Sequence, residues 1–380
     1  MRIAIAGFGV GGAALAVMLA RDGHDVTVYE RAADPGPVGA GFLLQPSGQA
    51  VLADLGLLDE VAAASWPITA FHADSAQGRT LSELRYDRRD PTAHALGVSR
   101  GKLFLTLMSA AATAGARLDA GTEFGGAIER PDAVVPIAVS GEHLASVDIL
   151  VGADGMRSVV RRVVDPGARL FLSPFAALWG LGVTAVTCEH RLVQQTRGVG
   201  LLAGLLPVGE REAAVFWGLR VSELGELRAA GFERLVERTT AVLPAARPVL
   251  ESIGTFDRML LARYGHADVV RHHTDRIVLI GDAAHPTPPH LGQGANLALL
   301  DAAALATALR TAVAPRTAFE QWDRSRRWQN ARYAVLSRAL SPFFQSSHAW
   351  LGAPRDMGLP IMGAIPPLRA FMEHVLAGRG

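Results

Sequence analysis

The sequence predicts an α/β fold with a parallel sheet, joined to an α+β region with an antiparallel sheet and followed by C-terminal helices. Three observations lead to this prediction. A strand–turn–helix–strand pattern opens the chain within residues 3–31. Two later apolar strands, near residues 147–151 and 276–280, each run into a turn that contains glycine and aspartate. Between them, short apolar runs separated by glycine and charged residues are typical of antiparallel strands.

The opening unit carries the pattern of a nucleotide-binding βαβ motif. Gly7, Gly9 and Gly12 form a G-x-G-x-x-G turn between an apolar strand and an alanine-rich helix. The first glycine permits the turn, the second lets a pyrophosphate approach the backbone, and the third allows close helix–strand packing. The helix N-terminus offers free N–H groups to phosphates. Glu30 ends the second strand, where its carboxylate can accept hydrogen bonds from ribose hydroxyls. We therefore predict a Rossmann-like dinucleotide site.

The same stretch allows a second interpretation, as a secretory signal or a membrane span, because residues 3–20 are apolar and follow Met1-Arg2. Four glycines interrupt this run within six residues, and no small-residue cleavage site precedes a new domain start. The nucleotide-binding interpretation is therefore favoured. Elsewhere the sequence has no uninterrupted apolar run of about 20 residues, the length that a membrane span needs.

Composition excludes several classes of protein. The 380 residues, of which 49% are hydrophobic, suffice for two domains or for one large domain with an inserted one. A net charge of +1 provides no general attraction for nucleic acid. Cys188 is the only cysteine, which rules out internal disulfides, zinc sites built on cysteine clusters and the cysteine pair of a flavin disulfide reductase. A cytoplasmic location is the expectation.

Two further segments fit contacts with a ligand. The small residues Gly39, Ala40 and Gly41 would let a loop lie close to a cofactor, although an ordinary surface turn explains them equally simply. Arg100 stands in the first turn of a predicted helix, where a positive charge opposes the helix dipole. A phosphate or carboxylate nearby would account for this placement, and the alternative is a solvated arginine.

The two later strands end in polar turns. Asp154 and Gly155 follow the strand at 147–151, at the edge of an open α/β sheet where ligands usually bind. Gly281 and Asp282 follow the strand at 276–280, and a glycine-rich segment then leads into a helix over 297–310. Such a turn again presents free N–H groups, and the Asp282 carboxylate can accept hydrogen bonds from a polyol chain.

The pattern predicts a discontinuous division of the chain. Residues 1–70, 97–168 and 268–340 would form the cofactor-binding domain, residues 71–96 and 169–267 the substrate domain, and residues 341–380 a C-terminal helical tail. The substrate domain supplies five large aromatic residues, most of them expected in the core and a minority in a pocket: Phe171, Phe175, Trp179, Phe216 and Trp217. Prolines interrupt the apolar tail, which either packs on the body or touches a membrane surface.

Taken in order, the motifs resemble those of single-component FAD-dependent monooxygenases of the aromatic-hydroxylase group, the p-hydroxybenzoate hydroxylase-like family. The resemblance covers nearly the whole chain. It rests on Gly7-x-Gly9-x-x-Gly12 with Glu30-Arg31, on Asp154-Gly155-x-x-Ser158, and on Gly281-Asp282 with Pro289-x-x-Gly292-Gln293-Gly294-x-Asn296. In the tail, Arg355-Asp356-x-Gly358-Leu359 resembles a segment of ubiquinone-biosynthesis hydroxylases.

The resemblance implies a role for each motif. Glu30 would hold the adenosine ribose with Arg31 beside the AMP half, Arg100 would reach the pyrophosphate or ribityl chain, and Asp282 would bind the ribityl hydroxyls. Asp154 belongs to a motif tied to both FAD and pyridine-nucleotide use. The expected cofactor-binding residues are Gly7, Gly9, Val10, Gly11, Gly12, Glu30, Arg31, Gly41, Arg100, Asp154, Gly281, Asp282, Pro289, Gly292, Gln293, Gly294, Ala295 and Asn296.

The segment from Pro289 to Asn296 would lie against the flavin itself. N–H groups of Gly292–Asn296 would face the pyrimidine edge and stabilise negative charge on reduced flavin. The Pro289 carbonyl would lie near the flavin face where oxygen reacts, which makes Pro289 the one catalytic candidate. His290 departs from the small or apolar residue expected there and is assigned no role.

In this family NAD(P)H reduces the FAD, oxygen adds at flavin C4a, and the hydroperoxide delivers its distal oxygen to an electron-rich substrate. The resemblance thus implies hydroxylation of a hydrophobic aromatic, phenolic or polyketide-like molecule without a metal and without nucleic acid. Baeyer–Villiger oxygenation, double-bond reduction and a non-catalytic flavin-binding role remain alternatives. A halogenase is disfavoured, because Lys102 lies beside Arg100 and no Trp-x-Trp-x-Ile segment occurs. The oligomeric state and the choice between NADH and NADPH stay open.

The sequence contains only one complete dinucleotide fingerprint, and the resemblance gives it to FAD. NAD(P)H would therefore dock transiently near the flavin edge. The segment Gly39–Gly41 would let the flavin ring move to meet it, so that substrate binding controls flavin reduction.

Overall fold

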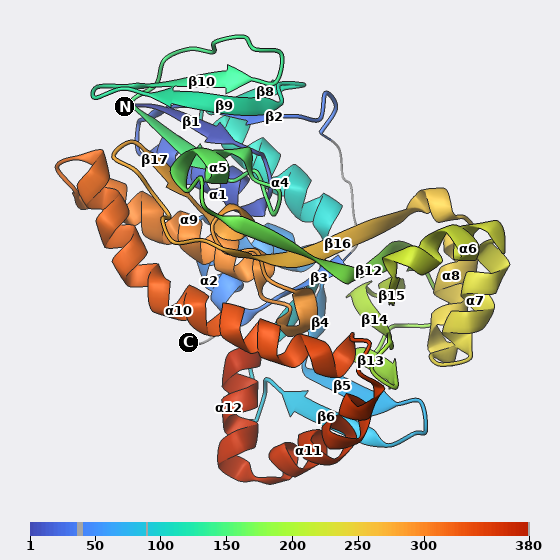
Figure 1. The fold of residues 1–380 in the computed structure, drawn as a ribbon. Coiled ribbons are helices and arrows are strands. Elements are labelled where there is room, and N and C mark those ends of the chain that lie inside the picture. Colours follow the sequence, from blue (N-terminus) through green and yellow to red (C-terminus); the bar gives the residue numbers. More distant parts are fainter. Residues whose placement is uncertain (36–40, 89, 379–380) are drawn as a thin grey trace.

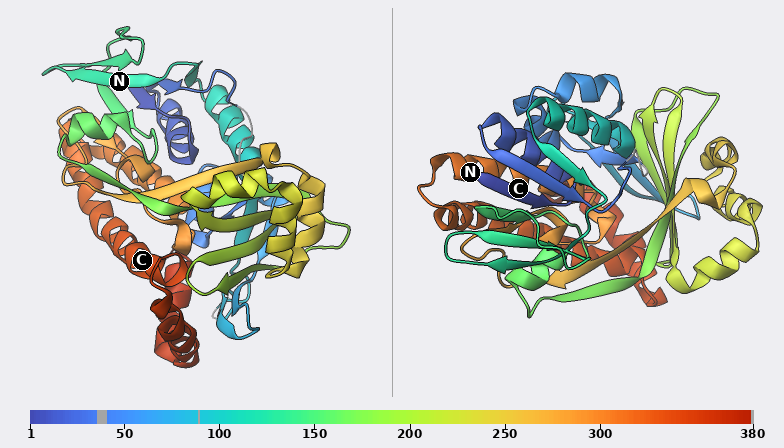
Figure 2. Two further views of the ribbon diagram at one scale, coloured as in Figure 1. Left: turned by 45° about the vertical axis from the view of Figure 1, so that its right-hand side comes forward. Right: turned by 90° about the horizontal axis from the view of Figure 1, so that it is seen from above.

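The computed structural model describes residues 1–35, 41–88 and 90–378. Two sheets dominate the molecule, and the long helix α10 (Pro315–Phe344) runs from the helices of the first sheet towards the second (Figure 1). Seen from above, the N-terminal sheet and its helices lie on one side, and the second sheet with its own helices lies on the other (Figure 2).

The first sheet is parallel throughout, in the order β17-β11-β1-β2-β8. Its strands are β1 (Arg2–Ala6), β2 (Asp25–Glu30), β8 (Arg117–Ala120), β11 (Ile149–Gly152) and β17 (Ile277–Leu279). The three central strands read as apolar runs because helices cover both faces of such a sheet. The surrounding helices are α1 (Val10–Arg21), α4 (Arg100–Thr113), α5 (Val159–Val164) and α9 (Gly294–Thr311).

Small residues bring α1 and α9 together beside the sheet. A Cβ on Gly11 would lie 3.1 Å from the Cβ of Ala298, and one on Gly281 would lie 3.0 Å from the same atom. Helices packed at this distance bring their N-terminal turns, which begin near Gly9 and Gln293, to the same region of the molecule.

Smaller elements complete the N-terminal part. A three-stranded sheet has the order β3-β7-β4, and a separate hairpin joins β9 to β10. These elements are β3 (Gly41–Leu44), β4 (Trp66–Ile68), β7 (Ala95–Ser99), β9 (Phe124–Glu129), β10 (Val134–Ala138), α2 (Pro46–Asp54) and α3 (Leu58–Ala63).

The second sheet has seven strands in the order β16-β12-β15-β14-β13-β5-β6. All neighbours pair antiparallel except β13 and β5, which are parallel. The strands are β5 (Ala70–Ser75), β6 (Thr80–Arg85), β12 (Arg169–Val183), β13 (Arg191–Arg197), β14 (Leu201–Gly209), β15 (Glu212–Arg220) and β16 (Met259–Asp268). The outer helices are α6 (Leu224–Ala229), α7 (Phe232–Thr240) and α8 (Arg247–Ile253).

Alternation along the strands gives this sheet two different faces. One face forms a buried cluster with α6, α7 and α8 and includes Ala213, Val215 and Trp217. The opposite face, which we call the inner face, carries Phe175, Trp179, Phe216, Gly218 and Tyr264. The inner face meets the N-terminal part, because a Cβ on Gly41 would lie 2.6 Å from Val208 Cγ1.

Two helices, α11 (Gly352–Ala364) and α12 (Pro366–Leu376), form the end of the chain. They project from the body in Figure 1, but both are anchored. The buried Arg355 guanidinium donates to the carbonyl oxygens of Gly198 and Phe343 at 2.7 and 3.1 Å. The Tyr333 hydroxyl donates to the Val375 carbonyl at 3.0 Å. Within the described ranges no helix is long and apolar enough to cross a membrane.

The predicted fold class is confirmed, with a parallel sheet, a largely antiparallel second sheet and C-terminal helices. Several element boundaries differ from the expectation. The sequence pattern predicts one short helix over residues 49–57, whereas in the structure α2 already begins at Pro46 and the short helix α3 follows it. The pattern also predicts a helix over residues 317–340, whereas α10 begins at Pro315 and continues to Phe344, past Pro342 in its last turn. The division into domains stays a prediction.

Candidate functional site

Each of the three positions in the first turn is occupied by glycine for a different structural reason. Gly7 has φ +97°, and a Cβ there would lie 2.6 Å from the Ala153 carbonyl oxygen. A Cβ on Gly12 would lie 2.2 Å from the Gly7 carbonyl oxygen, so neither position accepts a side chain without backbone movement. Gly9 is exposed, and a Cβ there would meet nothing within 4 Å. The steric freedom at Gly9, at the N-terminus of α1, leaves room for a ligand to approach the backbone.

Glu30 closes the second strand as predicted and lies beside this turn. Its carboxylate accepts hydrogen bonds from the backbone N–H groups of Phe8 at 2.9 Å and Ala32 at 3.1 Å. These bonds fix the orientation of the side chain and leave further lone pairs on each oxygen. Arg31 follows on the surface. The carboxylate therefore stands where a ribose hydroxyl could donate to it.

Asp154 lies against the same turn, since its Cα is 3.0 Å from the position of a Cβ on Gly7. Its Oδ2 accepts from the N–H groups of Val159 at 2.6 Å and Val160 at 3.2 Å, which caps α5. Burial raises the pKa of Asp154, against hydrogen bonds from Ser158 and the backbone that favour the charged form. The Asp154 Oδ1 atom is buried and has no hydrogen-bond partner among the described residues. An unpartnered buried acceptor of this kind indicates a contact that a ligand or solvent supplies.

A buried arginine links the second motif to the third. The Arg161 guanidinium donates to the carbonyl oxygens of Asp282 at 3.3 Å and Ala283 at 3.1 Å, and to that of Met156 at 2.5 Å. Burial lowers the pKa of Arg161, while the charges of Asp154 and Asp282 act in the opposite direction. Arg161 cannot be identified from the sequence, because the adjacent Arg162 is the same residue type in the same local pattern.

The fully buried Asp301 stabilises the turn at Gly281 through hydrogen bonds. Asp301 Oδ2 accepts from Gly281 N at 2.9 Å and lies 2.5 Å from His285 Nε2. Its Oδ1 accepts from Arg326 Nε at 2.8 Å and Asn330 Nδ2 at 3.1 Å. Burial alone would raise the pKa of Asp301, but His285 and Arg326 hold it well below its ordinary value. This network joins the glycine turn to α9 and α10.

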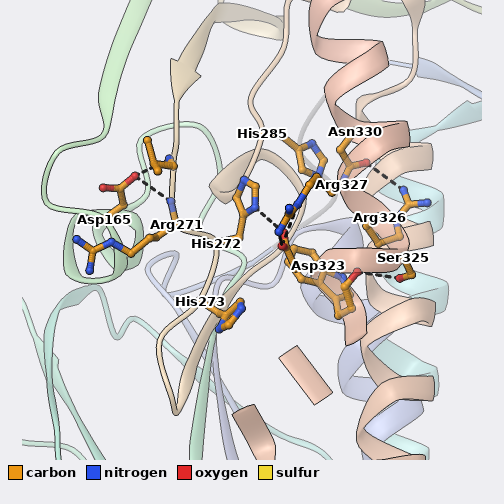
Figure 3. Close-up of polar contacts among 12 residues, drawn as sticks. Asp165, Arg271, His272, His273, His285, Asp323, Ser325, Arg326, Arg327 and Asn330 are labelled. Carbon is orange, nitrogen blue, oxygen red and sulfur yellow. Dashed lines mark hydrogen bonds and ion pairs between the residues drawn. The ribbon is translucent and has the colours of Figure 1, made fainter. Parts of the chain in front are cut away.

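A second set of polar contacts fixes the loop that precedes β17 (Figure 3). Asp165 Oδ2 accepts from the backbone N–H groups of Val270 at 2.7 Å and Arg271 at 3.2 Å. His272 Nδ1 lies 2.8 Å from Asp323 Oδ1 on α10. A surface cavity of about 220 Å³ opens here, lined by His273, Glu320, Asp323, Arg324, Arg327 and Trp328, and contains none of the predicted cofactor residues.

The Asp282 carboxylate takes no part in these networks, as far as the described residues show. Its side chain keeps an exposed surface and accepts no hydrogen bond from the described residues. Surrounding protein nevertheless raises the pKa of Asp282, and the charges of His285, Arg100 and Arg161 oppose that effect. A Cβ on Gly294 would lie 3.9 Å from Asp282 Oδ1, so the carboxylate stands beside the start of α9. Arg100, at the start of α4, is exposed and close enough to act on it electrostatically.

The glycine-rich segment before α9 keeps several backbone N–H groups free of helical hydrogen bonds. The first helical hydrogen bond runs from Leu297 N to Gln293 O at 2.8 Å, which leaves the N–H groups of Gly294, Ala295 and Asn296 ahead of it. Gly292 has φ +61°, and the Pro289 carbonyl oxygen accepts from Gly292 N at 2.9 Å. The Gly292 N–H thus occupies one lone pair of the Pro289 carbonyl oxygen. This is the carbonyl that we predict to lie near the flavin.

Two side chains of this segment are occupied elsewhere. The Asn296 amide is fully buried, accepts from Gln45 N at 2.9 Å and donates to Leu43 O at 3.1 Å. It therefore ties β3 to the glycine-rich segment. Gln293 Nε2 donates to Leu376 O at 2.8 Å, which ties the tail to the same place. Both residues would offer a cofactor their backbone rather than these side-chain groups.

Gly41 is buried between two sheets. It pairs with Ser99 of β7, and a Cβ there would lie 2.9 Å from Ala214 Cβ on the inner face. Gly39 and Ala40, the rest of the predicted mobile segment, lie outside the described residues. Gly41 thus forms a contact between cofactor-side and inner-face elements.

Aromatic rings cover the inner face opposite these loops. Trp179 and Phe216 lie 4.7 Å apart between ring centroids, and Phe175 and Tyr264 form a buried cluster beside them. The other two aromatic residues named in the sequence analysis lie elsewhere. Trp217 is buried towards the outer helices, and Phe171 is 43% exposed and stacks on His266. Tyr264 was missed, since an isolated tyrosine in a strand carries no local signal.

Asp301 had a detectable signal that we did not use. It is the single acid within the alanine- and leucine-rich helix that follows the third motif. A charged residue on an otherwise apolar helix is buried only if paired. Its partner Arg326 could not have been chosen among the many arginines of α10. Across the described ranges no group of three or more His, Cys, Asp or Glu side chains is arranged as metal ligands.

Comparison with known proteins agrees with this geometry. Residues 1–327 match the family described as an FAD binding domain. The 3-amino-4-hydroxybenzoate 2-monooxygenase of Streptomyces cremeus is 33% identical over 368 residues, covering 90% of this chain and 88% of that protein. PqsL of Pseudomonas aeruginosa, solved with 2-aminobenzoylacetate, is 26% identical with a TM-score of 0.80, over 93% of this chain and 98% of PqsL. HpxO of Klebsiella pneumoniae, solved with FAD and uric acid, shares the fold at 21% identity and a TM-score of 0.85, over 100% and 97% of the two chains.

The resemblance inferred from the ordered motifs is therefore confirmed. A family match over most of the chain, the relative at 33% identity and the shared fold agree on one assignment. The chain belongs to the FAD-dependent flavoprotein monooxygenases of the aromatic-hydroxylase group.

Proposed function

We propose that this protein is an NAD(P)H- and O2-dependent hydroxylase of a hydrophobic aromatic, phenolic or polyketide-like small molecule. The observation that carries the proposal is the convergence of four motifs on one sheet edge. Residues Ala6, Tyr29, Gly152 and Leu279 are laterally aligned in the parallel sheet. Each precedes a motif, so the glycine turn, Glu30, Asp154 and Gly281–Asp282 all follow the carboxyl ends of neighbouring strands. Ligands of open α/β sheets bind at this edge.

The residues present fit FAD. Free N–H groups at the starts of α1 and α9 suit the pyrophosphate and the flavin pyrimidine edge. Glu30 suits the adenosine ribose, with Arg31 beside it, and Arg100 with Asp282 suits the ribityl and pyrophosphate region. The unpartnered Oδ1 of Asp154 can accept one more hydrogen bond beside Gly7. These assignments extend to the other expected contacts, including Val10, Gly11 and Gly41.

When bound, FAD takes two electrons from NAD(P)H and activates molecular oxygen for transfer to the substrate. The chain's own residues bind, orient and exclude water. The N–H groups of Gly294–Asn296 would stabilise negative charge on the reduced cofactor. The Pro289 carbonyl, partly engaged by Gly292, would border the reacting face. The aromatic inner face would hold the substrate and keep water away.

The substrate class draws on the relatives. The Streptomyces cremeus relative is named for an aminohydroxybenzoate, and PqsL was solved with an aminobenzoyl compound. Trp179, Phe216 and Tyr264 provide rings against which such a compound could pack. The oligomeric state is left open. Contact with a membrane surface stays a prediction without a supporting contact, although α11 and α12 expose Met357, Ile361 and Phe371.

The test is a screen of phenols, aminohydroxybenzoates and aromatic ketones for compounds that accelerate NAD(P)H oxidation. Products are then identified by mass spectrometry. Gain of one oxygen with an intact ring supports the proposal. Ring expansion of a ketone indicates Baeyer–Villiger oxygenation, gain of two hydrogens indicates reduction, and no stimulation by any compound favours a non-catalytic flavin protein. Heat-released chromophore should chromatograph as FAD, because an adenosine half is what Glu30 would recognise.

A further inference from the structure

One amide group on the inner face has an unused hydrogen-bonding atom. Gln345 caps the end of α10 and is only 8% exposed. Its Oε1 accepts a hydrogen bond from the Tyr264 hydroxyl. Its Nε2 is buried and has no hydrogen-bond partner in the part of the chain that the structure describes. An unsatisfied buried donor costs free energy unless something else accepts from it.

The position of Gln345 is built by the fold. Its own N–H donates to Ser341 O at 2.8 Å, and Ser346 N donates to Val199 O at 2.7 Å. The Arg355 guanidinium bonds to Phe343 O at 3.1 Å on the preceding turn. A Cβ on Gly218 would lie 2.4 Å from Gln345 Nε2, so the amide occupies the space that this glycine leaves on the inner face.

The amide lies among aromatic rings and next to the flavin-facing segment. His290 is edge-to-face with Tyr264 at 6.1 Å and stacked on Phe344 at 5.8 Å between ring centroids. Its neighbour Pro289 begins the turn that leads to the glycine-rich segment. Burial lowers the pKa of His290 to about 4, so the imidazole is neutral at pH 7. Its Nε2 is also buried without a partner among the described residues.

A positive charge lies on the same face. Arg220 is two residues beyond Gly218 on β15, so the two positions lie about 7 Å apart on one side of the sheet. The Arg220 guanidinium carbon is 5.0 Å from the centre of the Phe175 ring. Within the described ranges, no carboxylate pairs with it. An amide donor, an arginine and three aromatic rings thus border one region of the inner face.

We propose that Gln345 Nε2 donates a hydrogen bond to an oxygen substituent on the aromatic ring of the substrate. This proposal rests on the proposed function and adds a requirement to it: the ring carries a phenol, carbonyl or carboxylate oxygen. Arg220 would favour an ionised oxygen, and neutral His290 would contact the substituent beside it. Gln345 lies beyond the residues that match the family model, which end at 327.

The test measures binding alone, through the absorbance change of the FAD-bound protein on titration with three probes. The probes are naphthalene, 1-naphthol and 1-naphthoate, which share a ring system and differ in the oxygen substituent. We expect Gln345→Met to reduce the preference for an oxygenated probe over naphthalene by about five- to tenfold, the effect of one lost hydrogen bond. Gln321→Met, on an exposed position of the same helix, should leave the preference unchanged.

Each outcome decides the matter. If the preference for 1-naphthol over naphthalene falls in Gln345→Met, the oxygen is a phenol; if the preference for 1-naphthoate falls, it is a carboxylate. Equal preferences in the wild type and Gln345→Met, or no preference in the wild type, overturn the proposal. If the single variant loses FAD, Tyr264→Phe/Gln345→Met removes both hydrogen-bonding partners together and serves in its place. The binding test involves no turnover, so it is independent of the substrate screen. If the screen finds no substrate but Gln345→Met still loses the preference for an oxygenated probe, the proposed function is refuted and the hydrogen bond from Gln345 is supported.

Discussion

The flavin-binding part and the inner face border the same site but are built in different ways. On the flavin side, most predicted contacts follow the carboxyl ends of parallel strands, and their geometry comes from backbone turns. Side chains such as Asp301, Arg161 and Asn296 lie behind the turns and have nearly all their hydrogen bonds satisfied. On the inner face, aromatic side chains supply the surface. Polar atoms of Gln345 and His290 remain buried without hydrogen-bond partners among the described residues.

The two regions differ in how the sequence encodes them. A cofactor that is the same in every relative can be held by fixed backbone geometry, which glycine and short motifs encode locally. A substrate that differs between relatives is met by side chains that distant strands and the end of α10 bring together. Substitutions should therefore affect stability and FAD binding on one side, and ligand preference on the other.

The largest effect is expected from Asp301→Asn. The change leaves Arg326 buried without its counter-charge, and breaking a buried pair costs about 3–5 kcal/mol. The control is Asp275→Asn, which removes an exposed pair with Arg316 and should change the stability little. Urea denaturation at pH 7 in the presence of FAD measures both. Equal losses for the two variants would contradict a structural role for the buried network.

The stability difference between the wild type and Asp301→Asn should depend on pH. The pKa of Asp301 is lower in the folded protein than in the unfolded chain, where it is about 3.9. Its contribution is therefore complete above about pH 4 and is lost as the pH falls towards the folded-state pKa. The stability difference between the wild type and Asp301→Asn should narrow below about pH 4. A difference that widens on acidification would show that the pKa shift has the opposite sign.

Gly12→Ala should follow in size and should affect both folding and FAD. The new Cβ would lie 2.2 Å from the Gly7 carbonyl oxygen, and overpacking of this kind costs about 1–3 kcal/mol. The matched control is Gly225→Ala, since a Cβ there meets nothing within 4 Å and alanine favours its helix. Thermal unfolding and retained flavin absorbance are the measurements. Full FAD content in Gly12→Ala would argue against close helix–strand packing as a condition for binding.

Glu30→Ala and Asp282→Ala should weaken FAD without unfolding the protein. Loss of the hydrogen bonds that each carboxylate would accept corresponds to about 1–3 kcal/mol of FAD affinity. Asp282→Ala should have unchanged stability as apoprotein, because its carboxylate accepts no hydrogen bond from the described residues. Glu30→Gln keeps an acceptor for Phe8 N and separates loop support from ribose binding. Wild-type FAD affinity in Asp282→Ala would place the flavin elsewhere.

The sequence predicted most of the flavin side. The glycine turn, Glu30, Asp154 and Asp282 all lie within a few residues of a strand end, and the glycine-rich segment directly precedes a helix, so local pattern locates them. It did not locate the groups behind them. Arg326 is one of several arginines on α10, and the sequence does not show which of them turns inward to Asp301.

The inner face could hardly be predicted at all. Tyr264 and Gln345 meet across 81 residues of sequence, and neither belongs to a motif. The parallel pairing of β13 with β5 joins segments more than 100 residues apart and has no local signature. His290 was recognised as unusual, but its contacts with Tyr264 and Phe344 depend on where α10 ends. Such long-range contacts come from the assembled fold.

The smallest expected effect concerns the boundary between the two regions, at Gly41. We expect substrate to accelerate anaerobic flavin reduction by NAD(P)H at least about tenfold, which is about 1.4 kcal/mol on the barrier. NAD(P)H has no second fingerprint to bind, and Gly41 packs on Val208 and Ala214 of the inner face, so a substrate there can shift the neighbouring β3 segment.

Gly41→Pro would stiffen this segment but would also clash with the inner face, because even a Cβ lies 2.6 Å from Val208 Cγ1. The sharper variant is therefore Gly41→Ala combined with Val208→Ala, which restricts the backbone and removes the nearer of the two obstructing groups, leaving Ala214 Cβ at 2.9 Å. We expect it to slow substrate-stimulated reduction in stopped-flow measurements while substrate binding changes little. Val208→Ala alone is the control and should keep the stimulation. Reduction rates that are equal with and without a turned-over substrate in the wild type would refute the control of reduction by substrate.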